Sequence, residues 1–281
     1  MTAAAPPAPA GQRPHRPPPH RPGFSRLLLS EWTKIRSVRS TVWSLALLVI
    51  VTLGFTGLLT WLTVLQWDKS GAAQRAQVSS DPVGVILGSG LTFGQLAICV
   101  LGVLVICSEY STGAIRSTLL AVPRRIPMLV AKAVVFAALV LVLGEIVTFT
   151  SFFLGAAILH SHVPVALGDP GVTRAVIGGG LYLTVLGLFA LSIGALIRHT
   201  AGAITGVIAF VLVLAPLTQL IPGSIGKYVH AYLPSEAGQL IGHAHQQADQ
   251  VLSPWQGFGV FCLWTVVLLA AAAELLRRRD A

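Results

Sequence analysis

The sequence predicts an all-α, polytopic membrane protein with six transmembrane helices, an N-terminal amphipathic helix and a short helix between the second and third spans. Hydrophobic residues make up 54% of the 281 residues and charged residues only 10%, whereas soluble domains carry about 25% charged residues. Uncharged runs occupy residues 40–67, 82–108, 175–197, 199–226 and 250–273. About 20 helical residues cross a bilayer core, and lipid leaves no hydrogen bonds for exposed backbone, so these runs must be helices.

The predicted spans cover residues 41–66, 82–107, 127–159, 172–197, 201–221 and 254–276. The second has a start signal, because Asp81 is a suitable N-cap and Pro82 suits the first helical position. The third contains Glu145 and is longer than a bilayer is thick. Three glycine pairs have the GxxxG spacing that allows close helix packing in lipid: Gly84 and Gly88, Gly90 and Gly94, and Gly202 and Gly206.

The chain before the first span divides into two parts. Residues 1–23 are rich in Pro, Ala and Arg, a composition that builds no apolar core and predicts a disordered tail. Residues 24–39 have helical periodicity, with an apolar arc that includes Phe24, Trp32 and Ile35 and a polar side that includes Lys34 and Arg36. This predicts a helix lying on the membrane surface, with a plain extension of the first span as the alternative. The membrane domain proper is then 40–281.

The basic residues predict the topology. Of the 19 lysines and arginines, a cytoplasmic N-terminus leaves only Lys69, Arg75, Arg174 and Lys227 outside, which satisfies the positive-inside rule with both termini in the cytoplasm. Because basic residues flank the apolar runs instead of forming one soluble face, the net charge of +9 does not indicate nucleic-acid binding. The three cysteines lie inside apolar runs and form no disulfide framework.

The cytoplasmic segment that joins the second and third spans, residues 109–125, has helical signals. Thr112 can cap a short helix, Pro123 ends it, and Ile115, Leu119 and Val122 share one face. So short a helix is marginal alone and needs a surface on which to dock.

These features, in this order, resemble the ABC-2 type permease family. The resemblance covers nearly the whole chain: the N-terminal motif Glu31-Trp32-Thr33-Lys34-Ile35-Arg36-Ser37, six spans, the loop pattern Glu109…Gly113…Ile115-Arg116…Pro123-Arg124-Arg125…Lys132, and Tyr232-Leu233-Pro234 before the last span. The resemblance implies that the loop forms a coupling helix seated in a groove of a separate ATPase. The residues it assigns to this contact are Glu109, Tyr110, Gly113, Ile115, Arg116, Leu119, Pro123, Arg124 and Arg125.

No phosphate-binding loop accompanies these features. The nearest candidate, Gly223-Ser224-Ile225-Gly226-Lys227-Tyr228, has too short a glycine spacing and no Ser or Thr after the lysine. The resemblance therefore implies a transport subunit of an exporter that is not itself an enzyme and has no cofactor. ATP and Mg²⁺ would be bound by the partner ATPase, and a second permease copy or a sister permease would complete the pathway in the plasma membrane.

Three further features have open interpretations. Glu145 is an acidic residue deep in a span and predicts either a proton or substrate site or a protonated packing residue bonded to Thr148 or Ser151. The pairs His160/His162 and His243/His245 lie in outer loops, where solvated histidines are favoured over a metal site. In residues 222–253, Ser235 is a candidate cap for a short helix, which by resemblance would be a partly re-entrant gate.

Two other functions compete with the permease. A stand-alone transporter driven by protons would use Glu145, but such folds show internal repeats and none is evident in this sequence. A membrane-embedded enzyme would need paired acids or a nucleophile motif at the right depth, and the sequence contains none there.

Overall fold

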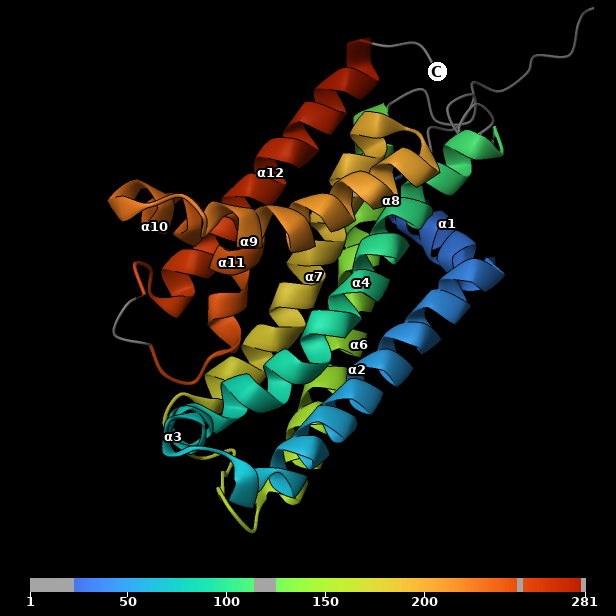
Figure 1. Cartoon of the computed structure of the whole chain (residues 1–281). Helices are drawn as coiled ribbons and strands as arrows, with labels where there is room; N and C mark the ends of the chain where they lie inside the picture. The colour runs from blue at the N-terminus through green and yellow to red at the C-terminus, as the bar shows by residue number, and fades with distance from the viewer. Residues whose placement is uncertain (1–22, 114–124, 247–249, 279–281) are drawn as a thin grey trace, which may run out of the picture.

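The computed structural model describes residues 23–113, 125–246 and 250–278, and within these residues the chain is helical without strands. Six helices are long and apolar enough to cross a membrane, which confirms the six predicted spans (Figure 1). Nearly all of the predicted tail at 1–23, and the predicted short helix after Gly113, lie outside the described residues.

Five of the spans are single helices: α2 (Arg39–Leu65), α4 (Pro82–Ser111), α6 (Arg125–Leu159), α7 (Val172–Ile197) and α12 (Pro254–Arg278). Helix α6 has 35 residues and therefore a length of roughly 50 Å, which confirms that it exceeds the bilayer core. Helix α4 runs to Ser111, beyond the predicted end at Cys107, because its last turn lies among other helices where Glu109 is paired with lysines.

The fifth span is irregular. It consists of α8 (Thr200–Ile208), a π-helical turn η2 (Ala209–Val213) and α9 (Leu214–Thr218). Pro216 explains the widened turn, since its ring lacks an N–H and would clash with the carbonyl of residue 212 in a regular helix. The span ends at Thr218, three residues before the predicted end at Ile221.

Helices α4 and α7 form the centre of the bundle. In each, 72% of the most apolar 18-residue window is buried, against 17% in α2 and 22% in α12. Helix α2 packs on α4 at Gly90 and Gly94, where an added Cβ would lie 2.0 Å from Thr56 Oγ1 and 2.1 Å from Thr52 Oγ1. This glycine pair is therefore a close helix contact, whereas a Cβ at Gly202 or Gly206 would meet nothing closer than 3.4 Å.

Shorter helices cover the two ends (Figure 1). Helix α1 (Phe24–Ser37) lies at the end where α2 begins, and η1 (Trp67–Lys69) and α3 (Ala72–Ser80) lie at the opposite end. Between α9 and α12 the chain forms α10 (Gly223–Ala231), α11 (Pro234–Gln239) and η3 (Leu240–Gly242).

The prediction that Ser235 caps a helix is wrong. The N-cap is Leu233, two residues earlier, because Pro234 occupies the first helical position, where a missing N–H has no consequence. Ser235 is buried inside the helix. The helix packs closely on α12: a Cβ at Gly257 would lie 2.3 Å from the carbonyl oxygen of Ala237.

Candidate functional site

Four charged side chains from three helices meet at the end of the bundle where α1 lies. Glu31 and Lys34 come from α1, Glu109 from the last turn of α4, and Lys132 from the second turn of α6. We call these four residues the charge cluster. Glu109 lies two residues before the end of α4, and Lys132 lies seven residues after the start of α6, so the cluster lies near the base of the loop that is predicted to dock.

The lysines and glutamates alternate in the charge cluster. Lys132 Nζ lies 2.5 Å from Glu31 Oε2 and 2.9 Å from Glu109 Oε1. Lys34 Nζ lies 2.7 Å from Glu31 Oε1 and 3.1 Å from Glu109 Oε1. Each lysine therefore bridges both carboxylates, and the four groups connect α1, α4 and α6 in a closed ring of ion pairs.

Burial of the charge cluster carries a large cost in desolvation free energy. The side chains of Lys132 and Glu31 are each 2% exposed, and desolvating such ions costs several kcal/mol apiece, which their attraction repays only in good geometry. An apolar cluster of similar size would be about as stable. We therefore attribute to the cluster a role in fixing the relative positions of three helices.

Lys34 is the most exposed member of the charge cluster, with 36% of its side chain accessible. Burial lowers the pKa of its ammonium, but the hydrogen bond to Glu31 and the negative charges of Glu109 and Glu31 outweigh burial and raise the pKa above its usual value. Lys34 is therefore charged at neutral pH, as the ion-pair ring requires.

A second contact connects α7 to the same end of α4. The guanidinium of Arg198 lies 5.2 Å from the centre of the Tyr110 ring, a cation–π distance. Arg198 ends α7 in a left-handed conformation with φ of 58°, which is unusual for a residue with a side chain and directs the chain into α8.

The predicted loop begins with a left-handed turn. Thr112 is the C-cap of α4, and its N–H donates to the carbonyl of Ser108, so it ends this helix instead of starting the next. Gly113 follows with φ of 69°, a conformation that glycine adopts without steric cost. A β-branched residue would be strained at this φ.

The structure describes only part of the predicted docking segment. Glu109 and Tyr110 lie in α4 and Gly113 in its terminal turn, whereas Ile115, Arg116, Leu119, Pro123 and Arg124 lie outside the described residues. Arg125 begins α6. Since Glu109 is 8% exposed and faces the lysines, its side chain anchors the start of the loop and does not point away from the bundle.

Glu145 lies between α6 and α7, away from the charge cluster. A Cβ at Gly180 would come within 2.5 Å of its Oε1, so the absence of a side chain on α7 makes room for the carboxyl. Thr148 donates to the backbone carbonyls of Gly144 and Glu145. Within the described part of the chain, Glu145 Oε2 and Ser151 Oγ are buried without hydrogen-bond partners, so the predicted bonds to the carboxyl are not formed.

The opposite end of the bundle is held by Asp81 and Arg174. Asp81 accepts from the N–H of Gly84, which confirms the predicted N-cap, and also lies 2.8 Å from His243 Nδ1 and accepts from the N–H of Ala244. Arg174 donates to the carbonyls of Ile241, His243 and Ala244. We call these contacts the outer clamp. His243 thus pairs with a carboxylate, and no group of three metal-binding side chains occurs in the described ranges.

The sequence did not predict the ion pairs of the charge cluster or the contacts of the outer clamp. Glu31 and Lys132 were noted only as parts of family motifs, although opposite charges at helix ends on the same side of a bilayer were a usable signal. The pairing of Asp81 with His243, which are 162 residues apart, had no local signal.

No model of a protein family matches this chain, and no curated protein matches it significantly in sequence. The fold and the buried contacts described above are therefore the basis for assigning a function.

Proposed function

We propose that this chain is the membrane-spanning permease subunit of an ABC-2 type exporter, with ATP hydrolysed by a separate ATPase subunit. The observation that carries the proposal is the charge cluster. It ties together the two helices that flank the predicted docking loop, α4 and α6, and adds α1 to them.

The charge cluster suits a mechanical role. A force applied to the loop between Gly113 and Arg125 enters α4 and α6 together. Ion pairs through Lys132 prevent the ends of these helices from separating. Helix α4 is also one of the two central helices, in close contact with α7, where a Cβ at Gly102 would lie 2.5 Å from the carbonyl oxygen of Gly187. A displacement of the loop would thus reach the centre of the bundle.

The remaining features support the same proposal. On α1, Leu27 and Ile35 are buried whereas Phe24 and Trp32 are exposed, an arrangement suited to a helix that lies at the lipid interface. The charge distribution of the sequence supports a topology in which this end, both termini and the loop face the cytoplasm, and the plasma membrane is part of the proposal. Six spans are few to enclose a pathway, so a second permease would complete it.

The experiment that tests the proposal replaces Leu119, which the helical pattern places on the docking face. Leu119→Ala should weaken association with the ATPase about 10- to 100-fold, since a buried leucine contributes about 1.5–3 kcal/mol. Leu119→Asp should abolish association and the ATP hydrolysis that co-purifies with the membrane subunit, because an apolar groove cannot pair a carboxylate. Lys69→Ala, at the opposite end, is the control and should change neither. Unaltered association in Leu119→Asp would overturn the proposal.

Gly113 offers a matched pair of variants for the same measurement. Gly113→Asn should preserve association because asparagine tolerates left-handed φ, whereas Gly113→Val should reduce it because a β-branched residue does not. Equal association in the two variants would show that the turn after α4 does not position the docking segment.

A proton-driven transporter that works without an ATPase is the second candidate, favoured by one observation. The Oε2 atom of Glu145 is buried without a partner among the described residues, and an ionisable group at such a depth is often functional. The two candidates differ in the energy source. Vesicles that contain the purified chain alone should transport the substrate in a proton gradient only if this second candidate is correct.

A further inference from the structure

Two pockets meet beside the outer clamp. The larger, of about 290 Å³, lies among α10, α11 and the segment 250–252, with Lys227, His230 and Glu236 in its wall. The smaller, of about 30 Å³, lies between α4 and α7 and is capped by η3. Gln239 and His243 line both pockets, so the two are neighbours through these side chains.

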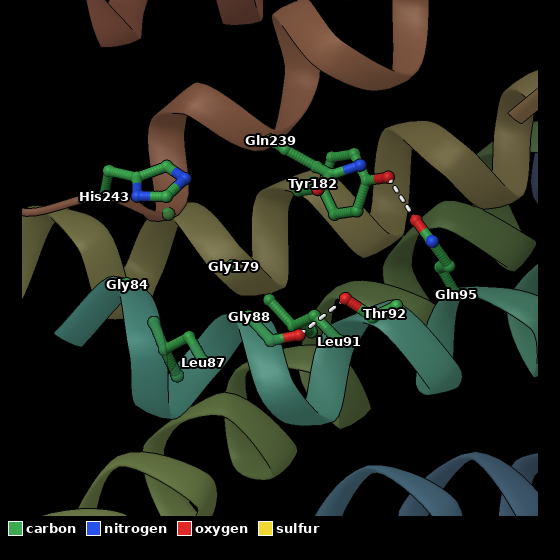
Figure 2. A pocket seen from close by; sticks show the side chains of 11 residues that line it. Gly84, Leu87, Gly88, Leu91, Thr92, Gln95, Gly179, Tyr182, Gln239 and His243 are labelled. Carbon is green, nitrogen blue, oxygen red and sulfur yellow. Dashed lines mark hydrogen bonds between the residues drawn. The ribbon is translucent and has the colours of Figure 1, made fainter. Parts of the chain in front are cut away.

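The smaller pocket extends along α4 toward the middle of the membrane (Figure 2). Its wall includes Thr92, which is exposed and lies ten residues after Pro82, or roughly 15 Å along the helix axis. Beyond Thr92, the hydroxyl of Tyr182 donates to Gln95 Oε1 at 2.7 Å. Figure 2 shows this pair and the Thr92 hydroxyl, which donates to the Gly88 carbonyl, on one side of the pocket.

Glycines create the space in the smaller pocket. Gly84, Gly88, Gly179 and Gly242 all line it. A Cβ added at Gly88 or at Gly242 would meet no atom within 4 Å, so each of these two residues borders open volume. A volume of about 30 Å³ admits a water molecule or one small chemical group.

The polar groups in the smaller pocket are uncharged or paired. They are Thr92, Gln95, Tyr182, Gln239 and His243, whose Nδ1 is already bonded to Asp81. No Asp, Glu, Lys or Arg is among the described residues that line it. An ion entering it would lose its hydration without gaining a counter-charge, whereas an amide or a hydroxyl would find hydrogen-bond partners.

We propose that the two pockets form one water-filled recess, open to the outer side, whose inner part binds an uncharged hydrogen-bonding group, an amide or a hydroxyl, of the exported molecule. That the ligand is an exported molecule rests on the function proposed above. The larger pocket, with its charged groups, is the wide outer part of the recess, where water screens these charges. The selection against ions occurs in the smaller pocket, which is the narrow inner part.

Thiol labelling tests the recess without knowledge of the cargo. Thr92→Cys should react with iodoacetamide added outside intact cells, above the background of the wild type, in which Cys99 and Cys107 are buried and Cys262 is partly exposed. Ser89→Cys is the matched control: it lies one turn nearer the outer end of α4 but outside the lining of either described pocket. If depth along α4 alone set the labelling rate, Ser89→Cys would react faster than Thr92→Cys. Reaction at Thr92→Cys without reaction at Ser89→Cys therefore identifies the recess.

Charge selection is tested with iodoacetate, the anionic counterpart of iodoacetamide. The ratio of the iodoacetamide rate to the iodoacetate rate should be at least tenfold higher for Thr92→Cys than for Gln74→Cys, which is exposed on α3. Adding Gly88→Leu to Thr92→Cys should fill the smaller pocket and lower the labelling rate at least tenfold. Gly54→Leu is the control, because a Cβ at Gly54 also meets no atom within 4 Å but the residue lies on the exposed side of α2, away from the pocket. Adding it to Thr92→Cys should not lower the labelling rate.

The outcomes separate this inference from the proposed function. Absent labelling at Thr92→Cys, or equal rate ratios at positions 92 and 74, would overturn the recess or its selectivity while ATPase association persists. Labelling as expected, together with unaltered ATPase association in Leu119→Asp, would overturn the docking proposal and leave the recess standing.

Discussion

At one end of the bundle, Glu31, Lys34, Glu109 and Lys132 join three helices by ion pairs between side chains, whereas at the other end Asp81 and Arg174 hold residues 241–244 mainly by backbone groups. The charge cluster is closed and contains two nearly inaccessible side chains. The outer clamp borders two pockets. The difference indicates that the first end joins three helices as one unit, whereas the second end holds one segment through the partners of a single aspartate and a single arginine.

The largest expected effect follows from breaking the charge cluster. Lys132→Met removes the ammonium that bridges Glu31 and Glu109 and leaves two buried carboxylates with a single lysine. We expect a loss of about 3–5 kcal/mol in the free energy of unfolding, measured by chemical unfolding in detergent. Lys69→Met, an exposed lysine in η1, should change stability by less than about 0.5 kcal/mol.

A double variant sharpens this prediction. Glu31→Met combined with Lys132→Met removes one charge of each sign and retains the pair between Lys34 and Glu109. It should recover at least half of the lost stability, because apolar groups replace buried ion pairs at little cost. A double variant as unstable as Lys132→Met would mean that the lysine acts through its packing and not through its charge.

A smaller effect is expected at the outer clamp. Asp81→Asn retains an N-cap but loses the carboxylate that faces His243, so we expect a loss of about 1 kcal/mol near neutral pH. Although burial raises the pKa of Asp81, the hydrogen bonds from His243 and Gly84 outweigh burial, and the pKa lies below 3.8. The contribution of this carboxylate is thus complete well above pH 3.8 and is lost as the pH falls through the lower, folded-state pKa.

The pH dependence supplies the control for Asp81. The stability difference between the wild type and Asp81→Asn should shrink below pH 3.8, because the wild-type carboxyl is then also neutral. A difference that stays constant down to pH 2 would show that the carboxylate charge does not contribute to the outer clamp.

The smallest effect is expected between the two ends, at Glu145. Under the permease reading its carboxyl only fills the space beside Gly180, and Glu145→Gln preserves that shape. We expect transport and ATPase association as in the wild type, and a stability change of less than about 1 kcal/mol. Loss of transport with intact folding and assembly would instead support a proton or cation site at Glu145.

Local signals in the sequence were sufficient for several elements. The start of α4 at Pro82 and its cap by Asp81 followed from residue type and position. Prediction failed where neighbours along the chain were misleading. Ser235 is a good capping residue in isolation, but Pro234 takes the first helical position and makes Leu233 the N-cap.

The sequence by itself determined that six helices cross the membrane, because a 20-residue apolar run has no other stable conformation in lipid. Only the tertiary structure decided how Glu31 and Lys132, 101 residues apart, share one ion-pair ring, and how Asp81 meets His243. Such pairings depend on which helix ends become neighbours. That order is set by close contacts such as Gly90 on Thr52 and Thr56. The GxxxG spacing of Gly90 and Gly94 indicates that some helix packs closely there, but it does not indicate which helix.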